Sequence, residues 1–446
     1  MSARVRHRLW LAFAGAWIAG AMVFAQAPTQ TPSRIAQADA IVDAILAREF
    51  AKITAQFDDA MKTALPGDTL ASGWAGTAAQ VGKLVTRRPA VEQRRGTSTV
   101  VVVGLQFEKA ALDVTISFNA NGQIDGLQIR PPAQAWSPPP YAAADKYTER
   151  AVTVGKGEWE LPGTLTLPVA TGRVPALVLV HGSGPNDRDE TLGPNKTFKD
   201  LAVGLASRGI AVLRYDKRSL VYGAKLAALK NPTVKDEVID DVLEAVALLR
   251  SDPAIDPDRI FVLGHSLGGM LIPRIGAADP KLAGLITLAG SVRPIEQLIA
   301  AQLQYLAEAD GVISPAEQQA LDEAKKALAT LAALTADDLK NPAKIANAPV
   351  SYWLDLRGYD PPAMAAKLPQ RLLVLQGARD YQVTTVDFDR WKTGLSGKTK
   401  VEFHLYPALN HLFLPGVGKS LPAEYAVPGH VPEEVIGDIA NWLRSK

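Results

Sequence analysis

The sequence predicts an α/β protein in which a mostly parallel sheet, covered by helices on both faces, is preceded by a small α+β domain. From about residue 147, short apolar runs alternate with helical stretches, which is typical of such a sheet. Residues 100–129 instead hold alternating apolar runs joined by turns, which is typical of antiparallel strands. A cluster of prolines separates the two regions. At 446 residues, the chain is long enough for two or three domains.

The first 25 residues are typical of a cleavable export signal. Three arginines precede the apolar run of residues 9–25, and this run ends in the small-residue pattern at which such signals are cut. We expect cleavage after Ala25, because Pro28 disfavours the second possible site. The alternative is an uncleaved anchor, but about 17 residues is the lower limit for crossing a bilayer. The sequence therefore predicts a periplasmic or secreted protein without a membrane span after signal cleavage.

Charge and cysteine content exclude several classes of protein. Lys and Arg minus Asp and Glu is 48 − 46 = +2, and removing the signal with Arg4, Arg6 and Arg8 leaves 45 − 46 = −1. A balance this close to neutral argues against nucleic acid or an anionic membrane as a partner. With no cysteine in the sequence, disulfides, thiolate nucleophiles and cysteine-bound metals are excluded. The six histidines form no HExxH motif, so we expect neither a metal nor a cofactor.

Residues 35–130 are expected to form the small α+β domain. Over residues 36–65, apolar side chains recur at close to i, i+4 spacing, which predicts one half-buried helix. Strands are predicted at residues 100–107, 112–118 and 124–129, with a tight turn at Asn121-Gly122. No residue cluster in this domain suggests chemistry. A stiff, extended, proline-rich linker is expected over residues 131–147.

The α/β domain is expected over residues 148–446. Apolar runs predict strands at residues 176–180, 210–215, 259–264, 285–289, 371–376 and 401–406. Helices are predicted at residues 198–207, 234–251, 270–278, 387–395 and 433–444. An Ala- and Leu-rich insertion at residues 292–367 separates the fourth and fifth of these strands. Because it follows the carboxyl end of a strand, this insertion is expected to form a helical lid.

A candidate nucleophile lies between the third predicted strand and the helix after it. Gly264-His265-Ser266-Leu267-Gly268 fits the pattern G-x-S-x-G in the strand–turn–helix context that this motif requires. A serine on so sharp a turn has a strained backbone, and glycine on either side leaves room for the strand and the helix to pass. We therefore predict Ser266 as a nucleophile. The alternative is a coincidental glycine-rich turn.

A serine nucleophile needs a base to take its proton and a carboxylate to orient that base. Asp380 lies in the loop after the predicted strand 371–376, and His411 lies in the loop after strand 401–406. Because both loops follow the carboxyl ends of strands, both side chains should reach the edge of the sheet that holds Ser266. We predict Asp380 as the acid and His411 as the base.

Other acids and bases fit these roles less well. Asp387 and Asp389, on the next predicted helix, are poorer candidates for the acid. His404 lies inside a predicted strand, and His430 lies between prolines in a predicted surface loop. His265, within the motif, is expected to point away from Ser266 and to be held by the sheet, so we assign it no catalytic role.

A tetrahedral intermediate also needs backbone N–H donors for its negative oxygen. We predict one donor at Leu267, at the head of the helix after Ser266, where the helix dipole adds to the effect. The second should come from the loop after strand 176–180. Pro185 in that loop has no N–H, so Ser183 is the better donor and Gly184 is the fallback.

Several charged residues near these loops have two possible roles. Asp187, Arg188 and Asp189 are expected to form an internal ion-pair latch, with substrate contacts as the alternative. Lys217 and Arg218 are expected to be solvated, with contacts to an acidic substrate as the alternative. Residues 416–420 resemble the end of a phosphate-binding loop but lack its first glycine, so we expect a loop near His411.

The segments HGSGPNDRD, RYDKRS, GHSLGG, GARDYQV and NH together resemble the α/β-hydrolase superfamily, and within it the secreted bacterial carboxylesterases of the EstD type near the serine-aminopeptidase branch. The resemblance covers residues 150–446, about two thirds of the chain. It implies an α/β-hydrolase fold with a Ser266, Asp380 and His411 triad and an oxyanion hole from Ser183 and Leu267. Many relatives carry glycines where this chain has Ser219-Leu220. The N-terminal region is similar to a cystatin-like α+β module of unknown role.

The sequence therefore predicts a cofactor-independent serine hydrolase that cleaves a small-molecule carboxylic ester through an acyl-enzyme. Gly184, Tyr352 and Trp353 are expected to line the substrate pocket, although core packing explains Trp353 equally well. An aminopeptidase-like peptidase is the close alternative, and an envelope-binding protein with the hydrolase fold as a scaffold is an alternative of another class. Acyl chain length and oligomeric state are not predicted. A peptidase would need carboxylates in the lid, where the chain offers Glu296, Glu308, Asp310, Glu317, Asp322 and Glu323.

Overall fold

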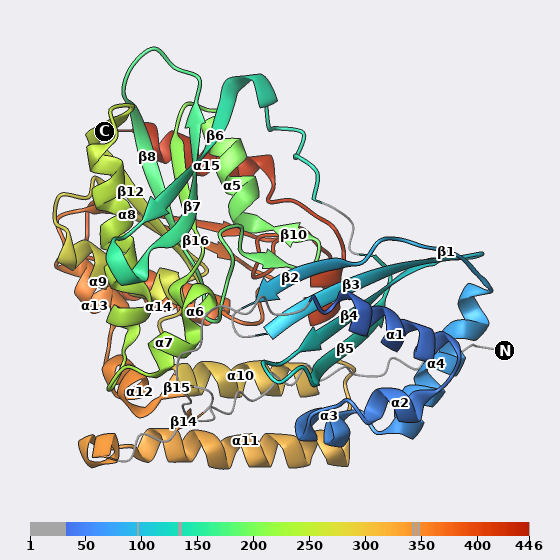
Figure 1. Ribbon diagram of the computed structural model, residues 1–446. Coiled ribbons are helices and arrows are strands. Elements are labelled where there is room, and N and C mark those ends of the chain that lie inside the picture. Colours follow the sequence, from blue (N-terminus) through green and yellow to red (C-terminus); the bar gives the residue numbers. More distant parts are fainter. Residues whose placement is uncertain (1–32, 96–97, 133–135, 341–343, 346–347, 446) are drawn as a thin grey trace. The chain divides into compact units, whose positions relative to one another are not determined.

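The computed structural model describes residues 33–95, 98–132, 136–340, 344–345 and 348–445 (Figure 1). The chain divides at Pro132 into two compact units, a point within the predicted linker. The predicted signal of residues 1–25 lies outside the described residues.

Helices and a twisted antiparallel sheet make up the N-terminal unit. The sheet contains β1 (Leu84–Arg87), β2 (Val91–Arg95), β3 (Ser98–Phe107), β4 (Ala111–Phe118) and β5 (Ile124–Arg130). The order is β1-β3-β4-β5, and β2 pairs with the other end of β3. The predicted turn before β5 is confirmed, because Gly122 has φ = 78° and the Asn119 carboxamide oxygen accepts N–H groups from Asn121 and Gln123. Apolar residues of alternate β3 and β4 positions face the helices, so the core lies between these layers.

The prediction of one helix over residues 36–65 is wrong. The chain forms α1 (Ile35–Leu46), α2 (Phe50–Thr54) and α3 (Asp59–Ala64), and a further helix, α4 (Gly67–Val81), follows. Arg48 adopts φ = 63° after α1, and Phe57 forms a bridge with Ile124 of β5. Asp58 then caps α3 by accepting the N–H of Met61. The helix is therefore interrupted where the chain pairs with the sheet.

The segment after Pro132 was expected to be an extended spacer, but residues 136–147 are bound to the second unit. The Trp136 indole N–H donates to Asp200 at 2.8 Å, and the Tyr141 hydroxyl donates to the Val431 carbonyl at 2.6 Å. The backbone N–H of Ala143 donates to Ser207 at 2.9 Å. Two partly buried aromatic side chains thus hold this segment in place, because each packs its ring on the unit and also satisfies its polar donor.

An eight-stranded sheet forms the centre of the second unit, in the order β17-β16-β13-β12-β8-β11-β7-β6 (Figure 1). The six strands from β17 to β11 in this order are parallel to one another. Strand β7 pairs antiparallel with β11, and β6 pairs antiparallel with β7. The six predicted strands are confirmed, and β6 and β7 are additional. The bounds are β6 (Tyr147–Val154), β7 (Leu161–Pro168), β8 (Val174–Val180), β11 (Ala211–Tyr215), β12 (Ile255–His265), β13 (Gly284–Leu288), β16 (Arg371–Gly377) and β17 (Val401–Tyr406).

Helices cover both faces of this sheet. On one face, α5 (Thr197–Ala206) and α15 (Glu433–Arg444) pack against Leu177, Leu179 and neighbouring side chains. On the other face, α8 (Asp240–Ser251), α9 (Leu267–Ala278) and α14 (Thr385–Gly394) pack against Val178 and Val180. Because successive side chains of a strand point to opposite faces, these fully apolar strands supply both cores. A π-helical turn (Lys235–Ile239) leads into α8, and short helices α6 (Arg218–Val221) and α7 (Gly223–Ala227) follow β11.

The described part of residues 292–367 is mainly helical, as predicted, and contains α10 (Ile295–Ala307), α11 (Pro315–Ala333), α12 (Val350–Leu356) and α13 (Pro361–Ala366). Helix α10 contacts the loop after β16, because Gln302 donates to the Gln382 carbonyl at 2.9 Å and the Tyr305 ring stacks on Tyr381 at 5.3 Å. Leu356 and Ala365 join the core beside α9. The last two helices therefore pack on the body of the unit, and α10 packs over the loop that holds Asp380. Short paired segments complete the second unit: β9 (Thr191–Leu192) with β10 (Asn195–Lys196), and β14 (Lys344–Ile345) with β15 (Ala348–Pro349).

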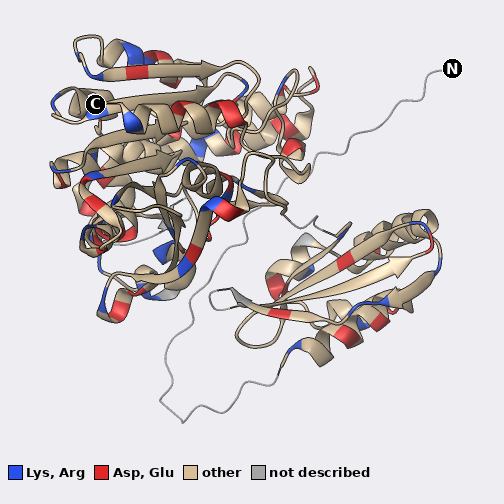
Figure 2. Cartoon of the chain, turned by 90° about the horizontal axis from the view of Figure 1, so that it is seen from above, with Lys and Arg blue, Asp and Glu red and all other residues tan. Residues whose placement is uncertain are grey.

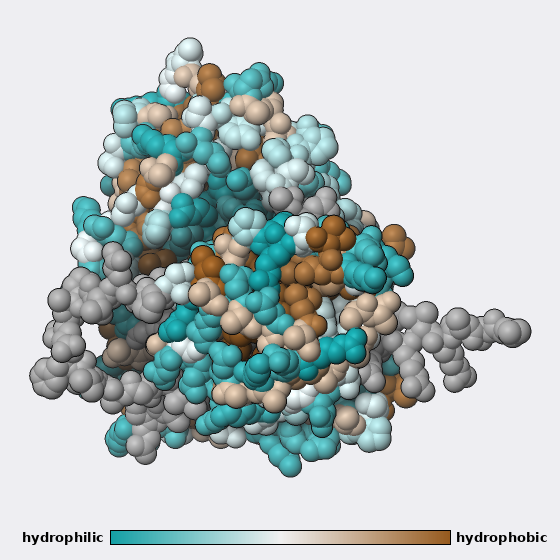
Figure 3. Space-filling model, turned by 45° about the vertical axis from the view of Figure 1, so that its right-hand side comes forward, coloured by the Kyte–Doolittle hydropathy of each residue, from teal (hydrophilic) through white to brown (hydrophobic). Residues whose placement is uncertain are grey.

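The described surface mixes charges of both signs. Lys and Arg are interspersed with Asp and Glu on the helices of both units (Figure 2). The face in Figure 3 is mostly hydrophilic, with apolar side chains in separate patches. Among the described helices, none combines the length and apolar character that a bilayer span requires.

Candidate active site

Four loops bring the candidate residues together at one edge of the sheet. They follow β8, β12, β16 and β17 and contain residues Ser183, Ser266, Asp380 and His411. Parallel strands all point the same way, so their carboxyl ends meet at a common edge. This topology confirms the expectation that the acid and the base approach the edge that holds Ser266.

Ser266 has a strained backbone, with φ = 53° and ψ = −115°. Few residues other than glycine adopt a positive φ, and such strain is concentrated at functional sites. The flanking glycines make this turn possible. A Cβ on Gly264 would lie 2.2 Å from the Gly268 carbonyl oxygen, and a Cβ on Gly268 would lie 2.4 Å from the Val180 carbonyl oxygen. Strand β12, helix α9 and strand β8 are thus packed backbone to backbone around Ser266.

Asp380 and His411 form a buried pair. His411 Nδ1 lies 2.7 Å from Asp380 Oδ2, and both side chains are almost fully buried. The other carboxylate oxygen, Oδ1, accepts the N–H groups of Gln382 at 2.8 Å and Val383 at 2.9 Å. Gln376 adds a donor to Oδ2 at 3.2 Å. The carboxylate is therefore fixed in position, and it holds the His411 proton on Nδ1, which leaves Nε2 able to accept a proton.

The rival acids and bases have other partners. Asp387 is fully buried and binds Arg293 at 2.7 Å, which fastens the start of the insertion to α14. Asp389 is exposed. His404 Nδ1 lies 3.2 Å from Asp438, and His430 Nδ1 lies 3.1 Å from Asp200, so both histidines pair with carboxylates away from the four loops.

A second buried pair, which the sequence did not reveal, supports the site. Glu190, with φ = 51°, accepts the Gly182 N–H at 2.7 Å, and its other oxygen lies 3.0 Å from His265 Nδ1. His265 Nε2 lies 3.0 Å from the carbonyl oxygen of His411, and the two imidazole rings are 4.7 Å apart. His265 is therefore held by the loops after β8 and β17, whereas we expected the sheet to hold it.

The pKa values of Glu190 and His265 shift in opposite directions. Burial alone would raise the pKa of Glu190, but the attraction of His265, with help from His181 and Gly182, holds that pKa below its usual value. Burial alone would lower the pKa of His265, but the Glu190 carboxylate raises it above its usual value. Glu190 and His265 thus lie side by side next to the candidate site and link its loops.

The loop after β8 passes directly beside Ser266. A Cβ on Gly182 would lie 3.1 Å from the Ser266 Cβ. Because Glu190 already accepts the Gly182 N–H, the next N–H along the loop, at Ser183, is the candidate oxyanion donor. Gly184 is exposed, with φ = 90°. Leu267 is the first residue of α9, so its N–H has no acceptor within the helix.

Ion pairs hold the rest of this loop, although their partners lie outside it. Arg188 binds both carboxylate oxygens of Asp216, through its Nε at 2.9 Å and its Nη2 at 2.8 Å. Asp189 binds Lys196 at 2.8 Å and also Arg214. The predicted latch is therefore present, but it ties the loop to β11 and to the segment before α5.

The prediction that Lys217 and Arg218 are solvated is wrong. Both are buried, because Lys217 binds Glu237 at 3.0 Å and Arg218 binds Asp241 through its Nε at 3.0 Å. The sequence pattern after β11 does not show that the π-helical turn and α8 place two carboxylates opposite these cations.

A network around Asn410 positions the His411 loop, and the sequence did not reveal it either. The buried Asn410 side chain accepts the N–H groups of Leu412 and Leu414, each at 3.1 Å, and donates to Glu424 at 3.1 Å. Arg379 binds the same Glu424 and the carbonyl of Gly418 at 2.8 Å. The segment that resembled a phosphate-binding loop is thus a support for the His411 loop, as expected.

The residues predicted to line a substrate pocket have other contacts. The Tyr352 hydroxyl donates to Glu237 at 2.9 Å and its ring packs on the core beside α9. Trp353 packs in the apolar cluster of the insertion with Leu331 and Leu334, as core packing predicts. Gly184 remains at the exposed surface of its loop.

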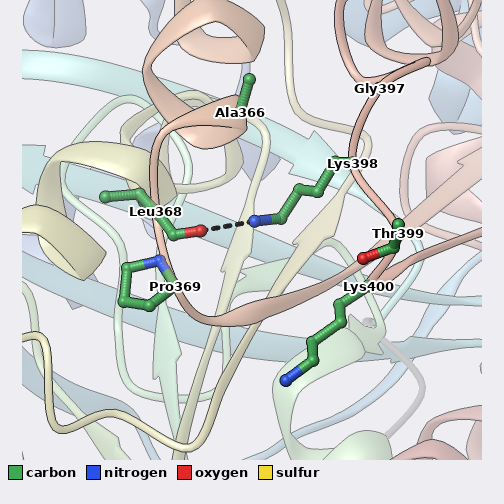
Figure 4. Close-up of a pocket in the computed structure, with 7 residues that line it drawn as sticks. All are labelled: Ala366, Leu368, Pro369, Gly397, Lys398, Thr399 and Lys400. Carbon is green, nitrogen blue, oxygen red and sulfur yellow. Dashed lines mark hydrogen bonds between the residues drawn. The ribbon is translucent and has the colours of Figure 1, made fainter.

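A cavity of about 320 Å³ lies elsewhere in the second unit (Figure 4). Its lining residues immediately precede β16 and β17, so it is at the amino ends of these strands, opposite the edge that holds Ser266. Lys398 reaches across it to the Leu368 carbonyl at 2.6 Å. The lining side chains include no carboxylate and no histidine, and we assign this cavity no function. They are Ala366, Leu368, Pro369, Gly397, Lys398, Thr399 and Lys400.

Comparison with known protein families shows to which family the chain belongs. The model of the "Alpha/beta hydrolase family" matches residues 177–426, more than half of the chain. The chain belongs to the alpha/beta hydrolase family. The predicted fold class and the predicted resemblance are thereby confirmed. Residues 38–127 match a second family, described as a protein of unknown function (DUF3887).

The chain is also similar to individual known proteins. The chain is 40% identical over 340 residues to "Esterase EstD" of Thermotoga maritima, which covers 76% of this chain and 78% of that protein. A polyketide transferase of Aspergillus fumigatus is 29% identical over 137 residues, or 31% of this chain and 40% of that protein. Among solved structures, an esterase of Pyrococcus furiosus aligns with a TM-score of 0.44 and 15% identity, covering 71% of this chain and 96% of that one.

Proposed function

We propose that this alpha/beta hydrolase cleaves carboxylic esters through an acyl-enzyme, with Ser266 as nucleophile, His411 as general base and Asp380 as the acid that orients it. The observation that supports this most strongly is the positive φ of Ser266 at the end of β12, combined with the 2.7 Å Asp380–His411 contact at the same edge of the sheet. The similarity to an esterase over three quarters of the chain supports an ester as the substrate class.

Acylation begins when the Ser266 hydroxyl oxygen attacks the ester carbonyl carbon and its proton passes to His411 Nε2. Asp380 accepts the hydrogen bond of the Nδ1–H and stabilises the imidazolium that forms. When the tetrahedral intermediate collapses, His411 returns the proton to the leaving alkoxide, which departs as an alcohol. The acyl group remains on Ser266.

Deacylation repeats these steps with water. His411 takes a proton from the water molecule, the resulting hydroxide attacks the acyl carbon, and the second intermediate releases a carboxylic acid and restores the Ser266 hydroxyl. Both intermediates carry a negative oxygen. We assign its binding to the N–H groups of Ser183 and Leu267, since Gly182 donates to Glu190 and Leu267 begins α9.

We further propose that the protein is exported, with cleavage after Ala25 and the mature enzyme in the periplasm or outside the cell. The support is the arginine-rich start, the apolar run of residues 9–25 and the small-residue pattern at its end. Helix α10, which packs over the loop of Asp380, is proposed to act as part of a lid.

The proposal is tested with a panel of p-nitrophenyl esters from acetate to palmitate, alongside aminoacyl p-nitroanilides. Ser266→Ala should abolish ester turnover. Ser396→Ala is the matched control, because it removes an exposed hydroxyl between α14 and β17, outside the four loops of the candidate site, so it should retain turnover. Undiminished turnover in Ser266→Ala would contradict the proposal.

The anilides test the peptidase alternative. A peptidase of this fold would need free carboxylates in the insertion for a substrate amino terminus. The described contacts favour a structural role for these carboxylates: Glu317 completes the cap of α11, and Glu308, Asp322 and Glu323 accept side-chain amides one helical turn away. We therefore expect ester turnover to exceed anilide turnover.

A further inference from the structure

Lys217 is a buried cation beside the candidate site, and the mechanism above does not use it. It follows β11 and its side chain is about 3% exposed. Its Nζ donates to the Gly182 carbonyl oxygen at 2.8 Å and lies 3.0 Å from Glu237 Oε1. A lysine so fully buried is rare unless it has a carboxylate partner and a specific contact.

Glu237 keeps this cation in place. Burial alone would raise the pKa of Glu237, but the charge and hydrogen bond of Lys217 and the hydroxyls of Tyr352 and Ser219 hold that pKa below its usual value. The Tyr352 hydroxyl donates to the second carboxylate oxygen at 2.9 Å. The Glu237 carboxylate is therefore ionised and is held at both oxygens. Because Glu237 is fixed, it also fixes the position from which the Lys217 ammonium donates to the Gly182 carbonyl oxygen.

We propose that Lys217 is a positioning residue for the oxyanion hole, which holds and polarises the peptide between Gly182 and Ser183. This inference rests on the proposed function. The carbonyl that Lys217 contacts and the Ser183 N–H belong to the same peptide unit. A cation on the carbonyl oxygen draws electron density through the amide and makes the N–H a stronger donor.

The neighbouring peptide is fixed as well. Glu190 accepts the N–H of Gly182 at 2.7 Å, on the other side of the same residue. An anion on the N–H and a cation on the C=O of Gly182 thus fix the direction in which the next N–H points. Pre-orientation of this kind is what makes an oxyanion donor effective, because no reorganisation is needed when the negative charge forms.

The kinetic consequence is specific. The negative oxygen exists in both tetrahedral intermediates but not in the bound ester, so loss of Lys217 should slow acylation and deacylation together. Removal of a complete oxyanion donor costs about 10²- to 10³-fold in kcat. Because the Ser183 N–H would remain but be weaker and less fixed, Lys217→Met should lower kcat by about 10- to 100-fold with little change in KM.

The test compares Lys217→Met, the double variant Lys217→Met/Glu237→Gln and the control Lys225→Met in the full-length protein. The double variant is needed because Lys217→Met alone leaves a buried carboxylate without its cation and can unfold the chain. Lys225 lies nearby on α7, and its side chain is 39% exposed. The active-site concentration of each sample is measured by stoichiometric titration with an organophosphate, so that kcat refers to folded, reactive sites alone.

A second readout separates positioning from mere structural support. A trifluoromethyl ketone forms an anionic hemiketal on the serine and needs the oxyanion hole, whereas the matching methyl ketone does not form that anion. In both Lys217 variants, the trifluoromethyl ketone should bind about 10- to 100-fold more weakly, in parallel with kcat, and the methyl ketone should bind as to the wild type.

The outcomes distinguish the two proposals. Wild-type kcat per site and wild-type affinity for the trifluoromethyl ketone in the double variant would overturn the role of Lys217 and leave the triad untouched. A fall in the number of sites, with kcat per site unchanged, would also overturn it, because Lys217 would then be a folding element. If Ser266→Ala retains full turnover, the proposed function itself fails.

Discussion

Replacing Asp380 with asparagine should reverse the hydrogen bond at His411 while leaving the loop folded. Oδ1 of Asp380 accepts two backbone N–H groups, from Gln382 and Val383, so the amide oxygen of an asparagine must take that place. The amide NH₂ then takes the place of Oδ2, which faces His411 Nδ1 at 2.7 Å. A donor there forces Nδ1 to accept, which moves the imidazole proton to Nε2.

The expected loss follows from this change of tautomer. With its proton on Nε2, His411 cannot take the Ser266 proton, and the imidazolium loses its counter-charge. A change of this kind in a serine triad lowers kcat by about 10⁴-fold, which corresponds to roughly 5.5 kcal/mol of transition-state stabilisation. The new NH₂ also faces the Gln376 amide at the former 3.2 Å contact, so a loss of about 1 kcal/mol in unfolding free energy should accompany it.

The assay is the initial rate of p-nitrophenyl butyrate hydrolysis, with thermal unfolding measured on the same samples. Asp389→Asn is the matched control, since Asp389 lies exposed on α14, nine residues after Asp380, and should retain wild-type turnover. Asp380→Asn with more than a tenth of wild-type kcat would refute the reasoning, as would an equal loss in both variants.

Three further predictions concern the scaffold of the site. Gly264→Ala places a Cβ 2.2 Å from the Gly268 carbonyl oxygen and should lower Tm by about 5 to 10 °C. The control is Gly437→Ala in α15, where an added Cβ meets no atom within 4 Å, so Tm should stay unchanged or rise. Equal Tm values in the two variants would contradict the packing argument. Asn410→Ala leaves two buried N–H groups without an acceptor, so it should lower the free energy of unfolding in denaturant by about 2 to 4 kcal/mol and also lower kcat. A stable, fully active variant would show that other contacts hold the His411 loop. Burial lowers the pKa of His181 to about 4; the charge of Lys217 adds to this effect and the charge of Glu190 opposes it. As the pH falls, the unfolded chain therefore binds a proton at His181 before the folded chain does. The free energy of unfolding should fall by about 3 kcal/mol as the pH drops from about 6.5 to 4. Denaturant titrations over this range should show a shallower fall for His181→Gln, and parallel curves would contradict the assignment.

The parallel strands and the order of the site residues could be predicted because most of these strands are short apolar runs, each followed by a loop. That pattern placed Asp380 and His411 at one edge and favoured Asp380 over Asp387, whose side chain binds Arg293. Strand β7 was missed because Pro162, Gly163 and two threonines interrupt its apolar residues, although it is largely buried. Strand β6 was missed because it exposes most of its side chains and carries no continuous apolar run. A strand at an edge of the sheet buries too little to show a clear period.

The buried charges could not be predicted, because they depend on which loops meet in space. Lys217 looks like a surface residue in sequence, yet α8 and the turn before it bring Glu237 to within 3.0 Å of it. Glu190 and His265 are 75 residues apart and meet because β8 and β12 are neighbours in the sheet. The prediction of one helix over residues 36–65 failed for a related reason, since the bridge between Phe57 and Ile124 outweighs the local helical preference.

Covalent labelling tests the central claim most directly. The wild-type protein is incubated with a fluorophosphonate, digested and analysed by mass spectrometry. We expect one adduct per chain, on Ser266, with labelling abolished in Ser266→Ala and slowed in Asp380→Asn. Ester turnover that persists without an adduct, or an adduct on a different serine, would contradict it.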